Sequence, residues 1–454
     1  MQRTRLACHL LCLAFGLASL LATSAAAAGS EARDPFFPRS GNRGYDVSDY
    51  HVELAYQPRG GKIKATATIE ARATQRLGHF SLDLNGLEVT AVSVDGKPAG
   101  FIRGRGKLKI SPRVPPSGGE EFTTVVHYQG VPRLLTDPDG SQEGWYRTDD
   151  GALAVGEPVG TATWIPCNNT LTDKAIFSFA ITVPRGLKGV ANGRLTGVTR
   201  RGAHTTFAWS AAEPMAPYLA GIDIGRGQLV RGKVGPKPSW TLVDPRMAAD
   251  SWPVLRKLPE VIHFESGVFG PYPFDTAGSI VDVAGFAYAL ETQTRPIYAF
   301  VPDLTTLVHE TAHQWFGDSV GLQRWPNIWL NEGFATWTQW YYAERHSGAP
   351  AVQTFRTLYR VPATNTKFWD PPSGHPGTAK NIFATSTYVR GAMALEALRL
   401  KIGTAKMLKT LRLWAAEHRY GNADIAEFIA LAEEVSGRDL GPLFQRWLYK
   451  RGKP

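Results

Sequence analysis

Residues 303–317 read DLTTLVHETAHQWFG, and this stretch decides the fold of the region around it. Its apolar spacing predicts a helix that begins near Asp303. His309 and His313 are four residues apart, so they lie on one face of that helix, about 6 Å apart along its axis. Two imidazoles at that spacing can bind one metal ion. The alternative is an exposed helix face that carries two incidental histidines.

A third metal ligand follows in residues 329–334, which read WLNEGF. Glu332 comes 19 residues after His313 at the start of the next predicted helix, and an antiparallel helix pair can bring its carboxylate to the same metal. The Asn-Glu-Gly sequence at this distance argues against incidental histidines. Two histidines, one glutamate and one open position favour Zn²⁺, one ion per chain, in a hydrolase. Glu310 lies beside the metal without binding it, and we expect its carboxylate to take the proton of the attacking water.

The sequence on either side predicts two domains of different class. From residue 45 apolar and polar residues alternate, which is typical of half-buried strands. After residue 235 the period becomes helical, and we expect helices at 247–268, 303–317, 330–346, 388–402, 404–418 and 423–436. The fold class is therefore α+β, with a flexible lead-in at 29–44, a β domain at 45–235 and a mostly helical domain at 236–454. Ligand sites tend to lie in the cleft between two such domains.

The first 28 residues resemble a secretory signal peptide. Arg3 and Arg5 precede an apolar run from Leu10 to Leu21, which is too short to cross a bilayer comfortably, and small residues follow as far as Ala28. We expect cleavage after Ala28, with an uncleaved anchor as the alternative. No later segment of the sequence is long and apolar enough to cross a membrane, so we expect no stable membrane insertion after cleavage. The mature protein is then secreted or periplasmic.

The chain has 454 residues and a formal charge of +10, yet its basic residues form no dense run and no nucleic-acid motif. The excess is spread thinly, as in Arg103, Arg105, Lys107 and Lys109, which favours a solvated surface. We therefore expect no nucleic-acid partner. Apolar residues make up 43% and charged residues 20%, which is typical of a globular protein rather than a disordered one.

Taken together, the motifs resemble the aminopeptidase N family of zinc metallopeptidases, a gluzincin group. The resemblance covers nearly the whole chain after the signal, with matches at the zinc motif and at 157–158, 173–175, 192–193, 269–273 and 444–448. It implies an N-terminal domain built on a saddle-shaped β-sheet, followed by a thermolysin-like catalytic domain. The chain ends soon after the catalytic domain, so the resemblance implies a compact form without the C-terminal helical domain of longer members.

The resemblance also implies roles for residues that their own surroundings do not assign. It implies that Tyr388, the first residue of the sequence YVRGA, donates a hydrogen bond to the oxyanion that forms when water attacks the peptide carbonyl. It implies that Glu291 binds the substrate ammonium, although its segment YALETQ keeps only this glutamate of the family's Gly-x-Met-Glu-Asn strand. Glu157 matches a second ammonium-binding position. Asn327 stands where many members of the family have an acidic residue. The sequence therefore does not indicate whether a residue at this position supports the metal ligands by hydrogen bonding.

These observations predict an exported zinc aminopeptidase that hydrolyses N-terminal peptide bonds of peptide substrates with a metal-activated water. One alternative is a zinc endopeptidase with the same catalytic site, which the degenerate ammonium-binding strand and the more open end of a compact form favour. A further alternative is a catalytically retired peptide-binding scaffold. The complete set of functional residues argues against that scaffold, and it comprises His309, Glu310, His313, Glu332 and Tyr388. The sequence does not indicate the oligomeric state.

Overall fold

The computed structural model describes residues 34–454, which belong to one compact unit. The predicted signal peptide at 1–28 and the first part of the predicted lead-in at 29–44 lie outside the described residues. Within the described part, none of the helices combines the length and the apolar character that a bilayer crossing needs.

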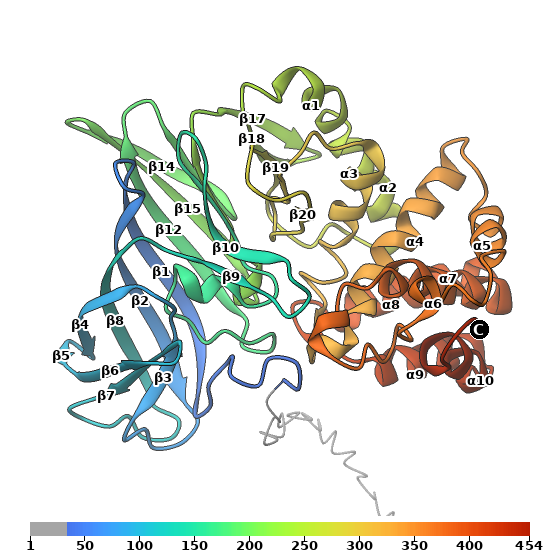
Figure 1. Ribbon diagram of the computed structural model, residues 1–454, viewed down its shortest axis with the longest axis horizontal. Coiled ribbons are helices and arrows are strands. Elements are labelled where there is room, and N and C mark those ends of the chain that lie inside the picture. Colours follow the sequence, from blue (N-terminus) through green and yellow to red (C-terminus); the bar gives the residue numbers. More distant parts are fainter. Residues whose placement is uncertain (1–33) are drawn as a thin grey trace, which may run out of the picture. The chain divides into compact units, whose positions relative to one another are not determined.

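An eight-stranded sheet is the framework of the first half (Figure 1). Its strand order is β14-β15-β12-β1-β2-β8-β4-β5. The bounds are β1 Tyr45–Gln57, β2 Lys62–Ala73, β4 Glu88–Val94, β5 Lys97–Pro98, β8 Glu121–Gly130, β12 Ala175–Pro184, β14 Arg194–Arg201 and β15 His204–Met215. In β1 the side chains of Tyr50, Val52 and Leu54 are at most 2% exposed, and the residues between them are more exposed. The predicted alternation is confirmed, because one face of this sheet packs on the core.

Two smaller sheets complete the first half. One has the order β13-β16-β11-β10-β9 and the other β3-β7-β6. The bounds are β3 Phe80–Asp83, β6 Gly100–Gly104, β7 Lys107–Ser111, β9 Leu134–Thr136, β10 Gln142–Arg147, β11 Ala152–Val155, β13 Lys188–Ala191 and β16 Ile222–Gly225. The five-stranded sheet contains β11, and Glu157, one of the predicted site residues, lies two residues after the end of that strand.

The second half opens with a five-stranded sheet in the order β17-β18-β19-β21-β20. The bounds are β17 Gln228–Val234, β18 Lys237–Val243, β19 Ala277–Val281, β20 Ala289–Leu290 and β21 Ile297–Tyr298. The domain boundary predicted between residues 235 and 236 falls in the turn of the β17–β18 hairpin, so β17 pairs within the sheet of the second half. Glu291 follows β20 directly, which places it at the edge of this sheet.

Helices make up most of the rest of the second half (Figure 1). The bounds are α1 Ala248–Leu255, α2 Leu258–Phe269, α3 Leu304–Ala312, α4 Trp329–Arg345, α5 Ala351–Tyr359, α6 Thr366–Trp369, α7 Thr385–Ile402, α8 Thr404–Glu417, α9 Ile425–Ser436 and α10 Gly441–Phe444. A β half followed by a mostly helical half confirms the predicted fold class. The single helix predicted at 247–268 is wrong. The chain forms α1 and α2 instead, because Pro259 lacks an N–H and suits the first turn of a new helix.

Partly buried polar side chains connect the two halves. Lys174, just before β12, donates its ammonium to the backbone carbonyls of Asp318 and Ser319 at 2.9 and 3.1 Å. The Asp34 carboxylate accepts the backbone N–H of Trp325 at 2.7 Å, so the described part of the predicted lead-in makes a specific contact with the second half. These contacts hold the first half against the segments on either side of Gly321.

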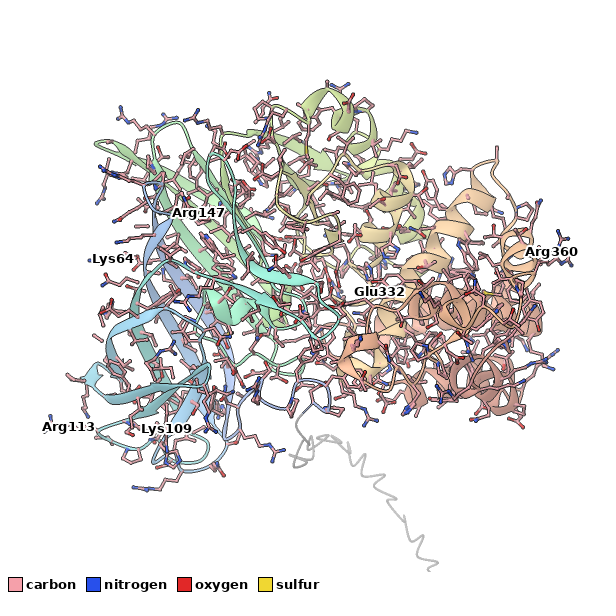
Figure 2. All side chains as sticks on the ribbon, in the orientation of Figure 1. Lys64, Lys109, Arg113, Arg147, Glu332 and Arg360 are labelled. Atoms are coloured by element: carbon pink, nitrogen blue, oxygen red, sulfur yellow. The ribbon has the colours of Figure 1, made fainter. Side chains whose placement is uncertain are left out.

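The positive charge is dispersed. Figure 2 labels Lys64, Lys109, Arg113, Arg147 and Arg360, and these cations do not gather in one place. The labelled Glu332 lies between the strands of the first half and the helices of the second.

Candidate metal centre and active site

The helix α3 carries the two histidines predicted as metal ligands. It begins at the predicted residue, because the Asp303 carboxylate accepts the backbone N–H of Thr306 at 2.7 Å and caps the helix. His309 lies in its last turn, and His313 follows its end with helical torsion angles. The centroids of the two imidazole rings are 4.7 Å apart.

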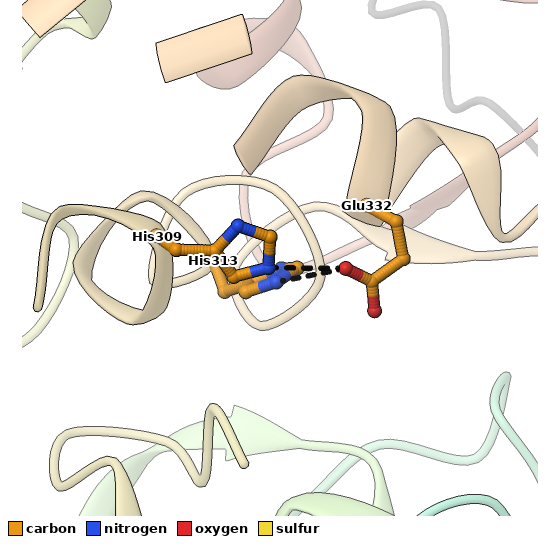
Figure 3. A group of neighbouring side chains, drawn as sticks. All are labelled: His309, His313 and Glu332. Atoms are coloured by element: carbon orange, nitrogen blue, oxygen red, sulfur yellow. Dashed lines mark hydrogen bonds and ion pairs between the residues drawn. The ribbon is translucent and has the colours of Figure 1, made fainter. Parts of the chain in front are cut away.

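The carboxylate of Glu332 faces both imidazoles from the first turn of α4 (Figure 3). Its Oε2 lies 3.1 Å from Nε2 of His309 and 3.5 Å from Nε2 of His313. Two ligands at about 2.0–2.1 Å from one tetrahedral Zn²⁺ are roughly 3.3 Å apart, so the observed separations fit such an ion. The three residues each offer one ligand atom within 4.8 Å of the others.

Two glycines let the helix of Glu332 approach the helix of Tyr388. A Cβ on Gly333 in α4 would lie 3.0 Å from the backbone carbonyl carbon of Gly391 in α7, and a Cβ on Gly391 would lie 3.1 Å from the Cα of Gly333. Such separations are tighter than most contacts of a Cβ, so a side chain at either position would require the two helix backbones to move slightly apart. Because each glycine is close in sequence to a predicted site residue, the helix contact brings Glu332 and Tyr388 toward one another.

The surroundings of His313 orient its ring. Its Nδ1 lies 3.0 Å from the backbone carbonyl of Phe316, so Nδ1–H donates there and Nε2 keeps its lone pair for a metal. His309 has no such support, since its buried Nδ1 has no hydrogen-bond partner within residues 34–454. The buried Oδ1 of Asn327, the residue noted as a departure from the family pattern, also has no partner in that range.

Glu310 lies beside the ligand set, as a general base must. It is 5% exposed, and its carboxylate groups with Glu291 and His313, one atom of each lying within 4.8 Å of the others. Burial raises the pKa of Glu310 well above its usual range, His313 lowers it, and Glu291 raises it further. This carboxylate can therefore take up a proton and return it.

Tyr388 lies in the first turn of α7, with its ring against the metal ligands. The centroids of the Tyr388 and His309 rings are 6.2 Å apart, and the two planes are within 22° of parallel. Burial raises the pKa of the Tyr388 hydroxyl well above 10, and the nearby carboxylates of Glu332 and Glu157 raise it further. The hydroxyl thus stays protonated and can donate a hydrogen bond.

The two predicted ammonium-binding glutamates come together from different halves of the chain. Glu291 is 3% exposed and lies next to Glu310 and His313. Burial raises the pKa of Glu157 well above its usual range, and the Glu291 carboxylate raises it further, so the two groups are close enough to repel. The Oε1 atoms of both are buried without a hydrogen-bond partner among the described residues. The structure therefore places all seven predicted residues around one site.

Gln314 is not among the residues predicted from the sequence, although its side chain contacts the segment that carries Glu291. Its position directly after His313 is the one feature of the sequence that points to a role in the site. Asn192 enters only through the family match at 192–193, whereas in the structure its side-chain amide donates to the backbone carbonyl of Gln293 at 2.8 Å. Neither contact could be found from the sequence, because the partners are distant in the chain.

Most of the second half resembles a known peptidase domain. A model described as the peptidase family M1 domain matches residues 301–447. Of the predicted site residues, this range contains His309, Glu310, His313, Glu332 and Tyr388. The leucyl aminopeptidase of Saccharolobus solfataricus is 22% identical over 440 residues, which cover 90% of this chain and 54% of that protein. The chain spans about half the length of the curated relatives it matches first.

Solved structures extend the similarity to both halves. The M1 zinc metallopeptidase from Deinococcus radiodurans has a TM-score of 0.86 and is 27% identical, and the match covers 93% of this chain and 98% of that one. A glutamate-to-alanine mutant of that metallopeptidase, bound to a Tyr-Ser-Ala substrate, has a TM-score of 0.85 and 26% identity over 93% of this chain and 98% of that one. Both are zinc metallopeptidases, and the ligand set described above fits the same ion. Zinc is therefore the cofactor of this chain.

Proposed function

We propose that this chain, which belongs to the M1 family of zinc metallopeptidases, is an aminopeptidase that removes the first residue from peptides with a free N-terminus. One observation carries the proposal. Beside the metal ligands, the Oε1 atoms of Glu157 and Glu291 are buried without a hydrogen-bond partner in residues 34–454. Such groups are costly to bury unpaired, and a substrate ammonium would satisfy both.

The remaining residues supply the hydrolytic chemistry. His309, His313 and Glu332 hold the ion, which when bound lowers the pKa of a coordinated water to about 7 and polarises the scissile carbonyl. Glu310 takes the proton of the attacking water and passes it to the leaving amine. Tyr388 donates its hydroxyl to the carbonyl oxygen as negative charge develops there.

The ammonium contacts decide which bond is cut. Charge-assisted hydrogen bonds are worth about 1.5–3 kcal/mol each, which corresponds to roughly 10-fold to over 100-fold in affinity. With the substrate ammonium held by Glu157 and Glu291, only the first peptide bond reaches Glu310 and Tyr388. An internal peptide segment would leave both carboxylates unpaired, which argues against the endopeptidase alternative.

The test compares peptides that differ only at the N-terminus. We expect kcat/KM for a free-amine peptide to exceed that for its N-acetylated form by at least 10-fold. Mass spectrometry of products from an unbiased peptide mixture, with and without a chelator, should show zinc-dependent loss of single N-terminal residues. Internal cleavage of N-acetylated peptides at the same rate would replace the aminopeptidase with an endopeptidase. The absence of zinc-dependent turnover would leave only a binding scaffold.

We also propose that the protein is exported and works in the periplasm or outside the cell. The support is the basic and apolar pattern of residues 1–28. N-terminal sequencing of the native protein should begin at Gly29, and cell fractionation should recover the activity outside the cytoplasm. A native protein that retains residues 1–28 in the cytoplasm would overturn export.

A further inference from the structure

The side chain of Gln314 joins the zinc-binding region to the segment that carries Glu291. Gln314 directly follows His313 and is 1% exposed. Its Nε2 donates to the backbone carbonyl of Glu291 at 3.1 Å, and its Oε1 accepts the backbone N–H of Thr294 at 2.7 Å. One side-chain amide thus uses both of its ends to hold a single short segment.

The hydrogen bond from the Thr294 N–H to Gln314 holds a residue with an unusual backbone conformation. Its φ of 68° lies in the left-handed region, which is strained for a β-branched residue. Such a conformation persists only where its surroundings define it. Besides the contact of its N–H with Gln314, its Oγ1 accepts the backbone N–H of Gly193 at 2.8 Å. Because Gly193 belongs to the first half, the turn after Glu291 is held from both halves.

Asn192 adds a second contact from the first half. Its Nδ2 donates to the backbone carbonyl of Gln293 at 2.8 Å, and its Oδ1 accepts the backbone N–H of Gly221 at 2.8 Å. The backbone around Glu291 is therefore fixed by hydrogen bonds, whereas the Oε1 of its carboxylate has no partner among the described residues. A fixed backbone with an open carboxylate suits a group that must meet a cation at a set position.

We propose that Gln314 is a positioning residue for the recognition of free N-termini, because it holds Glu291 at a fixed distance from the metal ligand His313. This inference rests on the function proposed above. The ammonium and the first scissile carbonyl belong to the same residue, with only its Cα between them, so the distance between the Glu291 carboxylate and the metal must match that short spacing. A glutamine with only a packing role could satisfy its amide with any nearby groups. Here the two shorter hydrogen bonds both go to the backbone of residues 291–294, the third and longer one comes from the Tyr272 hydroxyl, and Gln314 itself follows a proposed zinc ligand.

The test replaces Gln314 in the zinc-loaded enzyme. Gln314→Met keeps the length of the side chain and removes its hydrogen bonds to Glu291 and Thr294, together with the longer one that its Oε1 accepts from the Tyr272 hydroxyl at 3.4 Å. Gln314→Glu keeps the acceptor for Thr294 and Tyr272 but removes the donor to Glu291. Gln339→Met is the control, because the Gln339 amide donates to the backbone carbonyl of Thr305 at 3.3 Å and not to the segment that carries Glu291. The readouts are zinc content, melting temperature, and kcat and KM for a free-amine peptide and its N-acetylated form.

We expect Gln314→Met to raise KM for the free-amine peptide and to reduce the ratio of free-amine to N-acetylated kcat/KM by about 10-fold. Zinc content and the weak action on the N-acetylated peptide should persist, and Gln339→Met should keep the wild-type ratio. Gln314→Glu should also reduce the ratio of free-amine to N-acetylated kcat/KM. If Gln314→Met does not fold, this second variant tests the inference alone.

Two results would overturn the inference alone. One is a wild-type ratio in a folded, zinc-loaded Gln314 variant. The other is an equal loss on both peptides together with loss of zinc, which would mean that Gln314 supports only His313. By contrast, a wild-type enzyme without any preference for free amines would overturn the aminopeptidase function first, and the inference with it.

Discussion

The proposed zinc-binding side and the proposed ammonium-binding side of the site, called the zinc side and the ammonium side below, are built in opposite ways. His309, His313 and Glu332 come from two helices that follow one another in the chain, and the three side chains already contact one another. Glu157 and Glu291 come from different halves, and each has an oxygen without a partner in the described residues. The M1 domain match at 301–447 includes the first set and excludes the second.

Electrostatics separate the two sides in the same way. Burial raises the pKa of Glu332, but His313 and His309 lower it more, and the result is a pKa of about 2. Burial and the neighbouring Glu291 instead raise the pKa of Glu157. Within residues 34–454 the Glu332 carboxylate is paired with imidazoles, whereas the charged groups that shift the pKa of Glu157 are other carboxylates. The comparison predicts that changes on the zinc side abolish catalysis and that changes on the ammonium side alter selectivity.

The largest effect is expected for Glu332→Ala. Removing one of three protein ligands should weaken zinc binding and abolish activity on free and N-acetylated peptides alike. Elemental analysis after dialysis against a weak chelator gives the zinc content per chain. Full zinc occupancy in this variant would remove Glu332 from the ligand set.

Glu310→Gln should separate chemistry from metal binding. The amide cannot take the proton of the attacking water, so we expect a ~10²–10⁴-fold loss of kcat with wild-type zinc content. The variant also serves as a control for Glu332→Ala, since both remove one carboxylate from the same site. Near-normal turnover in the zinc-loaded protein would mean that another group takes the proton.

Tyr388→Phe should have a smaller effect, confined to the transition state. Loss of one oxyanion donor costs roughly 10²–10³ in rate, and KM should change little because the hydroxyl acts mainly on developing charge. Steady-state kinetics on the free-amine peptide gives both constants. If kcat is unchanged, Tyr388 only packs against His309.

The smallest effects are expected on the ammonium side, and they should depend on the N-terminus of the substrate. Glu291→Ala should lower kcat/KM for the free-amine peptide by roughly 10- to 100-fold and spare the N-acetylated one. Glu157→Gln should act in the same direction but less, because the side chain of Glu157 is partly exposed whereas that of Glu291 is buried. An equal loss of kcat/KM on both peptides would mean that Glu157 and Glu291 serve catalysis or zinc binding and not the recognition of the N-terminus.

The sequence by itself determined what depends on local spacing. The interval of four residues put His309 and His313 on one helical face, Asp303 marked the start of α3, and the alternation from residue 45 marked the strands. Helical and strand periods follow from backbone geometry, so they can be read without knowing the partners. The break between α1 and α2 was missed, because the signal of Pro259 was weaker than the helical period around it.

Only the tertiary structure decided how the distant parts meet. The close approach of Gly333 and Gly391, the two contacts of Gln314 and the left-handed Thr294 all depend on residues far apart in the chain. A buried polar group takes whichever partner the fold brings within hydrogen-bond distance, and the sequence around it does not name that partner. For this reason the zinc ligands could be predicted from their own spacing, whereas the pairing of Glu157 with Glu291 needed a family resemblance first and the fold afterwards.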